Sequence, residues 1–310
     1  VVVGDIAAIG RQQVTSAVQA RHLVREAQRS RLGHLAQRVA CTFTWDDLVV
    51  ADGLRAALED FAFEARDRAS FWEQDAARRL FPRGRGLISL FSGPPGTGKT
   101  MAAQVIAADL GLDLFRVDLA GVVSKYVGET SQNLERILAQ AAHMDIVLFF
   151  DEADALFSKR TEVKDAHDRF ANTDTDYLLQ AIESYDGIAI LATNKKANLD
   201  TAFTRRLRYV LEFAEPDATQ RLRIWRQITA ELAGPERTQA LDQHLRLLAE
   251  DVPLTGAQIK AAILTALFMA RRQGRPLDLE TLLAGLNREL LKEGRALSGR
   301  EVGNLRRHGQ

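Results

Sequence analysis

One segment constrains the fold more than any other, because its residues fit the pattern G-x-x-x-x-G-K-[ST] at every fixed position: Gly93-Pro94-Pro95-Gly96-Thr97-Gly98-Lys99-Thr100. The apolar run Leu87–Phe91 precedes it and a helical pattern over 100–110 follows, which is the context that the pattern requires. Glycines let backbone N–H groups surround phosphate oxygens, and the helix directs its positive end at the same anion. Gly93 to Met101 therefore predict a phosphate-binding loop. Lys99 would contact the β- and γ-phosphates of a nucleotide, and Thr100 would ligate Mg²⁺.

Short apolar runs alternate with helical patterns over the middle of the chain. The runs are Leu87–Phe91, Leu112–Leu119, Ile146–Phe150, Ile188–Ala192 and Tyr209–Phe213. This alternation predicts an α/β fold with a doubly wound, parallel, five-stranded sheet. Helical patterns are also expected at 11–40 and 52–80, and helices alone at 217–233, 239–249, 255–272 and 278–292. We expect a helical linker at 1–41, a large α/β domain at 42–216, and a small all-helical domain with a tail at 217–310.

Polar side chains stand at the ends of three of the predicted strands: they follow the third and the fourth strand and precede the fifth. Asp151-Glu152 ends the third run, where Asp151 would hold Mg²⁺ and Glu152 would polarise an attacking water. Asn194 ends the fourth run and would orient that water or touch the γ-phosphate, although asparagine is also common in loops. Three arginines stand before the fifth run: Arg205, Arg206 and Arg208. They either form a solvated basic turn or donate hydrogen bonds to the nucleotide of a neighbouring subunit.

Composition excludes several classes of protein. The chain is 46% hydrophobic, which argues against disorder, and lacks the long uncharged apolar stretch of a membrane span. Lys plus Arg equals Asp plus Glu at 41 each, so binding of nucleic acid by bulk charge is disfavoured. Cys41 is the single cysteine, which suits a reducing compartment and predicts a cytoplasmic location. The chain begins at Val1 rather than Met, so we expect upstream sequence.

These motifs resemble those of the AAA ATPases, the core branch of the AAA+ superfamily, over residues 42–292. Gly93–Thr100 is similar to Walker A with its Pro-Pro pair, Phe149–Asp154 to Walker B, and Thr193-Asn194 to sensor 1. Phe43–Leu48 resembles the entry to the adenine pocket. The resemblance implies that further nucleotide contacts come from Asp47, Leu48, Val49, Gly256 and Ala257.

The resemblance also implies a function. It implies a homo-oligomeric, hexameric ring that binds ATP and Mg²⁺ and couples hydrolysis to remodelling, unfolding or translocation of a protein. The segment 200–210 resembles the second region of homology, except that Arg206-Leu207 replace the usual Pro-Gly. Arg205 and Arg208 therefore hold the arginine-finger positions, with Arg206 as an adjacent competitor.

The segment that would grip the substrate is Lys125-Tyr126-Val127-Gly128, which resembles a pore loop. A flat amphipathic Tyr126 on a glycine-tipped loop suits intercalation between peptide side chains, the alternative being a buried tyrosine. His167–Asn172 also resembles bacterial AAA proteins encoded with phage-tail-like contractile injection systems. Two other functions stay open: a nucleic-acid motor, which Lys125 supports, and an ATP-gated assembly scaffold, against which Glu152 argues.

Overall fold

The structure, a computed structural model, describes residues 32, 36–81, 84–118, 129–153, 180–194, 204–205 and 207–297. The chain divides into two compact units, which are taken one at a time below. The first unit is Val1–Thr44, Ala56–Ser92 and Lys99–Glu212, and the second is Trp45–Arg55, Gly93–Gly98 and Phe213–Gln310. No helix in the described ranges combines the length and apolar character needed to cross a membrane.

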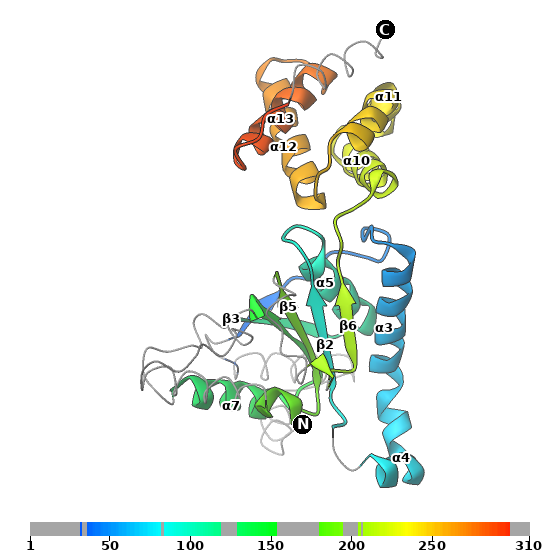
Figure 1. Ribbon diagram of the computed structural model, residues 1–310, viewed down its shortest axis with the longest axis vertical. Coiled ribbons are helices and arrows are strands. Elements are labelled where there is room, and N and C mark those ends of the chain that lie inside the picture. The colour runs from blue at the N-terminus through cyan, green and yellow to red at the C-terminus, as the bar shows by residue number, and fades with distance from the viewer. Residues whose placement is uncertain are drawn as a thin grey trace, which may run out of the picture. The chain divides into compact units, whose positions relative to one another are not determined.

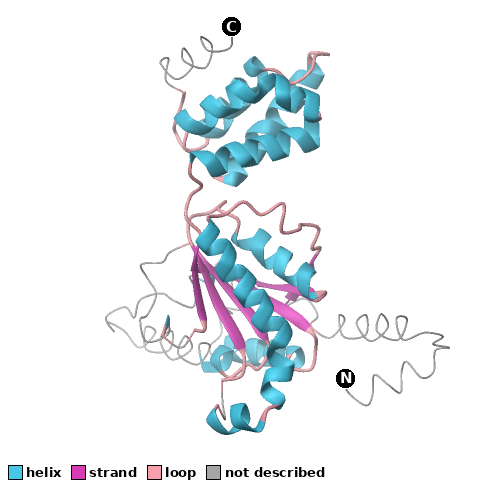
Figure 2. Ribbon diagram, turned by 90° about the vertical axis from the view of Figure 1, so that its right-hand side faces the viewer, coloured by secondary structure: helices cyan, strands magenta, loops and turns pink. Residues whose placement is uncertain are grey.

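Helices and strands alternate through the first unit and give way to helices alone in the second (Figures 1 and 2). Up to residue 212 they are β1 (Ala36–Val39), α3 (Asp52–Glu73), α4 (Asp75–Leu80), β2 (Leu87–Ser92), α5 (Lys99–Leu110), β3 (Asp113–Asp118), α7 (Glu129–Ala141), β4 (Ile146–Asp151), β5 (Ile188–Thr193) and β6 (Tyr209–Glu212). From residue 213 they are α10 (Ala218–Ala233), α11 (Pro235–Asp251), α12 (Gly256–Arg272) and α13 (Leu279–Leu291).

Within the described residues, the strands form one six-stranded sheet in the order β1-β3-β4-β5-β2-β6. The five strands from β3 to β6 pair in parallel, which confirms the predicted α/β class and parallel sheet. Parallel neighbouring strands require crossover connections, which here are the segments between the predicted apolar runs. Because β2 lies between β5 and β6, the residues that follow β2 and β5 leave the sheet at the same edge.

The sixth strand corrects the prediction of five strands. Ala36–Val39, in the stretch 11–40 that was predicted as helix, pairs antiparallel with β3 from Ala36↔Val117 to Val39↔Leu114. The Nε of Arg38 donates to Oδ1 of Asp113 at 2.9 Å, and Ala36 is buried. Pairing with a strand that is distant in the sequence thus decides the conformation of these four residues, where local pattern indicated a helix.

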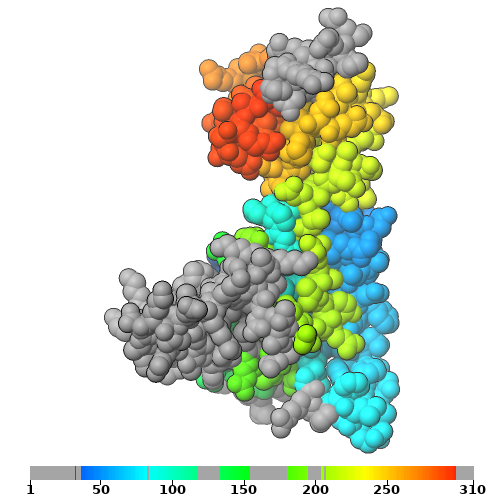
Figure 3. All heavy atoms as spheres, viewed as in Figure 1, coloured from blue at the N-terminus to red at the C-terminus, as the bar shows by residue number. Residues whose placement is uncertain are grey.

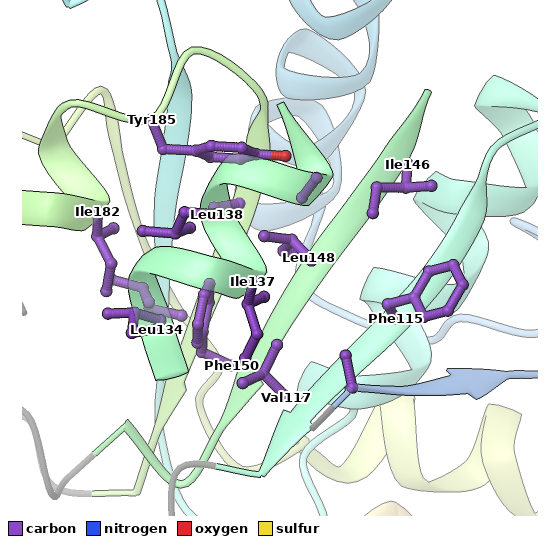
Figure 4. Packing of buried hydrophobic residues seen from close by; sticks show 14 of the residues in the cluster. Phe115, Val117, Leu134, Ile137, Leu138, Ile146, Leu148, Phe150, Ile182 and Tyr185 are labelled. Atoms are coloured by element: carbon purple, nitrogen blue, oxygen red, sulfur yellow. The ribbon is translucent and has the colours of Figure 1, made fainter. Parts of the chain in front are cut away.

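Both faces of the sheet are covered by helices. On one face, Leu134, Ile137 and Leu138 of α7 pack with Leu148 and Phe150 of β4 in a single buried cluster (Figure 4). On the other face, the ring of Phe61 in α3 meets that of Phe91 in β2 edge to face, with centroids 6.5 Å apart. Helix α5 lies against β3, β4 and β5. This double covering explains why the central strands are apolar along their whole length.

The helix predicted at 52–80 is in fact two helices, and the break is another correction. Gln74 has an extended backbone (φ −70°, ψ 131°) and is the N-cap of α4. The ring of Trp72 contacts that of Phe81 edge to face, at 6.0 Å between centroids, and Arg78 Nε donates to the carbonyl of Trp72 at 2.9 Å. These contacts fold α4 back on the end of α3, and no Gly or Pro marks the break.

The helices of the second unit begin at well-formed caps. Capping boxes pair Asp217 with Gln220, Thr255 with Gln258, and Asp278 with Thr281. Helix α11 begins at Pro235, earlier than the predicted 239, because proline at the first helical position needs no N–H partner. The core of this unit surrounds the fully buried Trp225.

Candidate nucleotide site

The first part of the candidate site lies in the first unit, where β5 and α5 bring Lys99 and Asn194 together. The Nζ of Lys99 donates to Oδ1 of Asn194 at 2.9 Å, although 95 positions separate the two residues in sequence. Lys99 is 8% exposed, so its ammonium group needs polar partners nearby. Asn194 supplies an oxygen without a negative charge, so this contact leaves the positive charge of Lys99 uncompensated by Asn194.

The acidic pair stands at the end of β4, the strand next to β5. Asp151 is half-buried, and its Oδ1 accepts the backbone N–H of Glu152 at 3.0 Å. Arg116 of β3 places Nη1 3.8 Å from Oδ2 of Asp151. The Glu152 side chain is exposed, and its backbone takes a left-handed conformation (φ 52°), the one non-glycine residue in the described ranges to do so. Strain of this kind concentrates at functional positions.

Asp151 and Thr100 carry oxygen donors of the kind that a hard divalent cation takes. Asp151 offers carboxylate oxygens, and Thr100, in the first turn of α5, offers a hydroxyl. Oxygen ligands of this type are those that Mg²⁺ takes in nucleotide sites. Thr100 and Met101 are both half-buried, so they lie at the margin of the core.

The second part of the candidate site lies in the second unit, where the loop Gly93–Gly98 meets the start of α12. The N–H of Ala257 donates to the carbonyl of Gly96 at 3.3 Å, and the hydroxyl of Thr97 donates to the carbonyl of Pro94 at 2.8 Å. Gly96 has a φ of 78°, and a Cβ there would lie 2.8 Å from Oγ1 of Thr255 and 2.9 Å from Cβ of Ala257. Only glycine fits this position, both in conformation and in space.

The residues expected beside the base lie in the same unit. Leu48 is buried, and a Cβ on Gly98 would lie 3.6 Å from its Cδ1. The amide Nε2 of Gln227 in α10 donates to the carbonyl of Asp46 at 3.2 Å and to Oδ1 of Asp47 at 3.3 Å. Val49 is half-buried. The segment 46–49 is thus held by a side chain of the helical part of the unit.

Two of the three candidate arginines lie in the described residues, and their surroundings differ. Arg205 is exposed, whereas Arg208 pairs with Glu64 of α3, with Nε 3.0 Å from Oε1. Arg206, the predicted pore loop Lys125–Gly128 and the segment His167–Asn172 all lie outside the described residues. Sequence reasoning missed Arg116, Gln227 and Glu64. A charged residue inside the apolar run 112–119 was a signal for Arg116, but the other two depend on packing between distant elements.

A parallel sheet in which the pattern G-x-x-x-x-G-K-[ST] follows β2, an acidic pair stands at the end of β4, and a lysine–asparagine contact joins α5 to the residue after β5 defines a P-loop nucleotide-hydrolase domain. Residues 89–215 match the family described as "ATPase family associated with various cellular activities (AAA)". Residues 89–215 therefore form a domain of the AAA ATPase family, and this domain is an ATP hydrolase by class. The order of motifs in the sequence had predicted this family correctly.

Three relatives agree with the assignment. The chain is 43% identical over 133 residues to a protein of Sinorhizobium fredii named an AAA family ATPase (y4kL), across 42% of this chain and 39% of the relative. It is 33% identical over 202 residues to ATPase family gene 2 protein of Schizosaccharomyces pombe, across 64% and 24%. It is 32% identical over 193 residues to 26S proteasome subunit RPT4 of Saccharomyces cerevisiae, across 60% and 43%. The chain spans less than half the length of these curated relatives.

Proposed function

We propose that this chain is the ATPase part of a ring-forming AAA+ protein that couples ATP hydrolysis to remodelling, unfolding or translocation of a protein substrate. The observation that carries the proposal is the hydrogen bond between Lys99 and Asn194 beside the strand that ends in Asp151-Glu152. A phosphate-binding lysine, a polar sensor and an acidic pair on adjacent parallel strands are the groups that a nucleoside-triphosphate hydrolase needs.

ATP would be held by backbone groups and a few side chains. Gly93 to Met101 would surround the phosphates, with Lys99 on the β- and γ-phosphates. The base would lie near Asp47, Leu48 and Val49, and near Gly256 and Ala257 at the start of α12. The buried Leu48 and the hydrogen bond from Ala257 to Gly96 support this assignment, because they bring the expected base-contacting residues and the loop into one compact unit.

Thr100 and Asp151 would hold Mg²⁺, which neutralises charge that develops on the phosphate oxygens during phosphoryl transfer. Glu152 would accept a hydrogen bond from the attacking water and polarise it, for which its exposed carboxylate is suited. Asn194 would bind the γ-phosphate or orient the same water while it keeps its contact with Lys99.

Assembly into a hexameric ring would complete each site, since an arginine among Arg205, Arg206 and Arg208 would reach the ATP of a neighbouring subunit. The pore segment Lys125-Tyr126-Val127-Gly128 would contact an extended polypeptide. A protein substrate is supported by the relative named as a proteasome subunit and by the zero formal net charge of this chain. We assign 42–216 to the nucleotide-binding domain, 217–310 to the helical lid, and the protein to the cytoplasm.

The decisive experiment measures ATP turnover of the wild type and of Glu152→Gln, with and without a chemically unfolded protein, beside the mass of the assembly with bound nucleotide. We expect turnover by the wild type, stimulation by the protein, and a ring whose mass corresponds to six chains. Stimulation by single-stranded DNA or RNA, lost at high salt, would instead favour a nucleic-acid motor. Nucleotide-dependent assembly without turnover would favour a scaffold.

A further inference from the structure

Glu64 of α3 binds two successive residues at the start of β6. The Nε of Arg208 lies 3.0 Å from Oε1 and 3.1 Å from Oε2 of Glu64, and the hydroxyl of Tyr209 donates to Oε2 at 2.9 Å. Figure 3 shows the atoms of α3 and β6 side by side on the surface. One carboxylate thereby fixes both the last residue before the strand and its first residue.

The apolar packing under this carboxylate makes the contact well defined. Phe61, one turn before Glu64, is fully buried and meets the ring of Tyr209 edge to face at 5.4 Å between centroids. Burial and the hydrogen bond to Glu64 raise the pKa of Tyr209 to about 12, so its hydroxyl is a protonated donor at neutral pH. Tyr209 is therefore held at its ring and at its hydroxyl by the same helix.

The turn before β6 is anchored on its other side as well. The N–H of Leu207 donates to the carbonyl of Thr204 at 3.3 Å, and the Leu207 side chain packs on the main core cluster. Arg205 stands on this turn with its side chain exposed and has no partner in the described ranges. The two arginines at the expected finger positions thus differ: Arg208 is engaged within its own chain, and Arg205 is presented to solvent.

We propose that Glu64 is a positioning residue: by holding Arg208 and Tyr209 it fixes the turn that carries Arg205, the arginine that the proposed function would then offer to a neighbouring subunit's ATP. The inference rests on the proposed ring ATPase and assigns roles within it. A donor that is already in place loses less conformational freedom when it engages the transition state. The Nε of Arg208 faces both oxygens of Glu64, and a charge-assisted contact of this kind is stronger than one between neutral groups.

The first test compares turnover with ATP affinity in single variants. Arg205→Ala should lower kcat about 10³-fold or more. Glu64→Gln and Arg208→Ala should lower kcat up to about 100-fold, because they misplace Arg205 without removing it. ATP affinity by calorimetry should stay near that of the wild type in all three. A fully active Arg205→Ala variant, or a loss in Arg206→Ala as large as that predicted for Arg205→Ala, would overturn the assignment.

Subunit mixing then tests action in trans. Rings of Arg205→Ala alone and of Glu152→Gln alone should both be inactive, for different reasons. Their mixture should regain turnover, because Glu152→Gln subunits present Arg205 to neighbours whose own Glu152 is intact. Glu64→Gln subunits should also gain turnover when they are mixed with Glu152→Gln subunits. Like Arg205→Ala, Glu64→Gln affects the arginine that a subunit offers to its neighbour and leaves its own Glu152 intact. A mixture that shows no gain over the separate proteins contradicts the proposal.

A charge swap separates positioning from direct action by Arg208. If Arg208 acts within its chain, Glu64→Arg combined with Arg208→Glu should recover much of the turnover that Arg208→Glu loses. If Arg208 itself reaches the neighbour's ATP, a glutamate there cannot be rescued by a change at Glu64. Should the double variant not fold, Arg208→Lys decides the same question: it should keep partial turnover if it retains the ion pair, and a loss equal to that of Arg205→Ala would overturn the positioning role.

A matched ion pair on the same helix provides the control. Arg66 of α3 binds Asp109 of α5 at 2.8 Å, with exposure similar to that of the Arg208–Glu64 pair. Asp109→Asn should leave turnover unchanged. If it lowered turnover as much as Glu64→Gln does, the effect of Glu64→Gln would come from a general loosening of α3. A wild type that binds ATP but never hydrolyses it would refute the proposed function; an active wild type with active Arg205→Ala would refute only this inference.

Discussion

The ammonium group of Lys99 and the side-chain oxygen of Asn194 are 2.9 Å apart, which joins the first residue of α5 to the residue after β5. A phosphate that arrives at Lys99 is therefore also within reach of the asparagine. We expect Asn194→Ala to retain ATP binding and to lower kcat about 10²-fold to 10³-fold, as the loss of one well-placed polar donor does in other sites.

The matched variant Asn194→Asp should behave differently. A carboxylate there would pair with Lys99 and repel the γ-phosphate, so ATP affinity should fall together with turnover. Calorimetric titration with ATP and steady-state phosphate release separate the two effects. Equal affinity of Asn194→Ala and Asn194→Asp for ATP would argue against the proposed place of the γ-phosphate.

Removal of Lys99 should affect ATP binding itself. Lys99→Ala deletes charge-assisted hydrogen bonds to phosphate, so the free energy of ATP binding should weaken by about 2 kcal/mol or more. Lys292→Ala is a suitable control, because that lysine lies after α13 and pairs with Glu289 at 2.7 Å. Calorimetry on both variants checks the prediction, and unchanged affinity in Lys99→Ala would count against the phosphate site.

Substitution of Glu152 should abolish ATP turnover, and substitution by glycine should also relieve strain in the backbone. Glu152→Gln, Glu152→Ala and Glu152→Gly should all bind ATP and fail to hydrolyse it. The left-handed backbone at φ 52° is costly for any side chain, so the glycine variant should be more stable than the alanine variant by about 1 kcal/mol. Denaturant unfolding compares the two; equal stability would show that no backbone strain is relieved there.

Gly96 and Gly111 allow steric crowding to be separated from backbone strain. Both have positive φ, 78° and 65°, but a Cβ at Gly96 meets Thr255 and Ala257 within 3 Å, whereas nothing lies within 4 Å at Gly111. Gly111→Ala should cost about 1 kcal/mol of stability and leave ATP binding unchanged. Gly96→Ala should in addition weaken ATP binding. The same ATP affinity in both variants would exclude a role for the contact between Gly96 and α12 in binding.

Alkaline pH should weaken the contact between Glu64 and Tyr209. The pKa of Tyr209 is raised to about 12 in the folded chain by burial and by the Glu64 hydrogen bond. Because the folded pKa exceeds that of the unfolded chain, this contribution to stability is present below about pH 10 and is lost as the pH rises toward 12. Urea unfolding of the wild type and of Tyr209→Phe should therefore converge over that range, while parallel curves would contradict the shift.

Much of the fold follows from local sequence. Glycine-bounded apolar runs predicted β2, β4 and β5 closely, because a strand buried on both faces needs apolar residues throughout. The strand and the helix that flank the segment Gly93–Gly98 were also predicted, as was the place of Asn194 directly after a strand. These predictions succeed because each feature is contained in a short, continuous segment.

Features that depend on contact between distant segments could not be predicted in this way. Ala36–Val39 carries no strand pattern and is extended because β3 is available to pair with it. The break at Gln74 follows from the packing of Trp72 against Phe81, which the sequence does not reveal. Glu64 was one of several acids on a charged helix, and only the arrival of Arg208 and Tyr209 beside it distinguishes it.

The antiparallel strand β1 also determines how the domain can be shortened. With Ala36–Val39 in place, the outer edge of β3 has its backbone groups paired. A protein that started at residue 42 would have the six-residue β3 as its open sheet edge in place of the four-residue β1, and longer edge strands are joined more readily by other chains. We therefore expect fragments that begin after Val39 to aggregate on expression, and fragments that retain this strand to stay monodisperse.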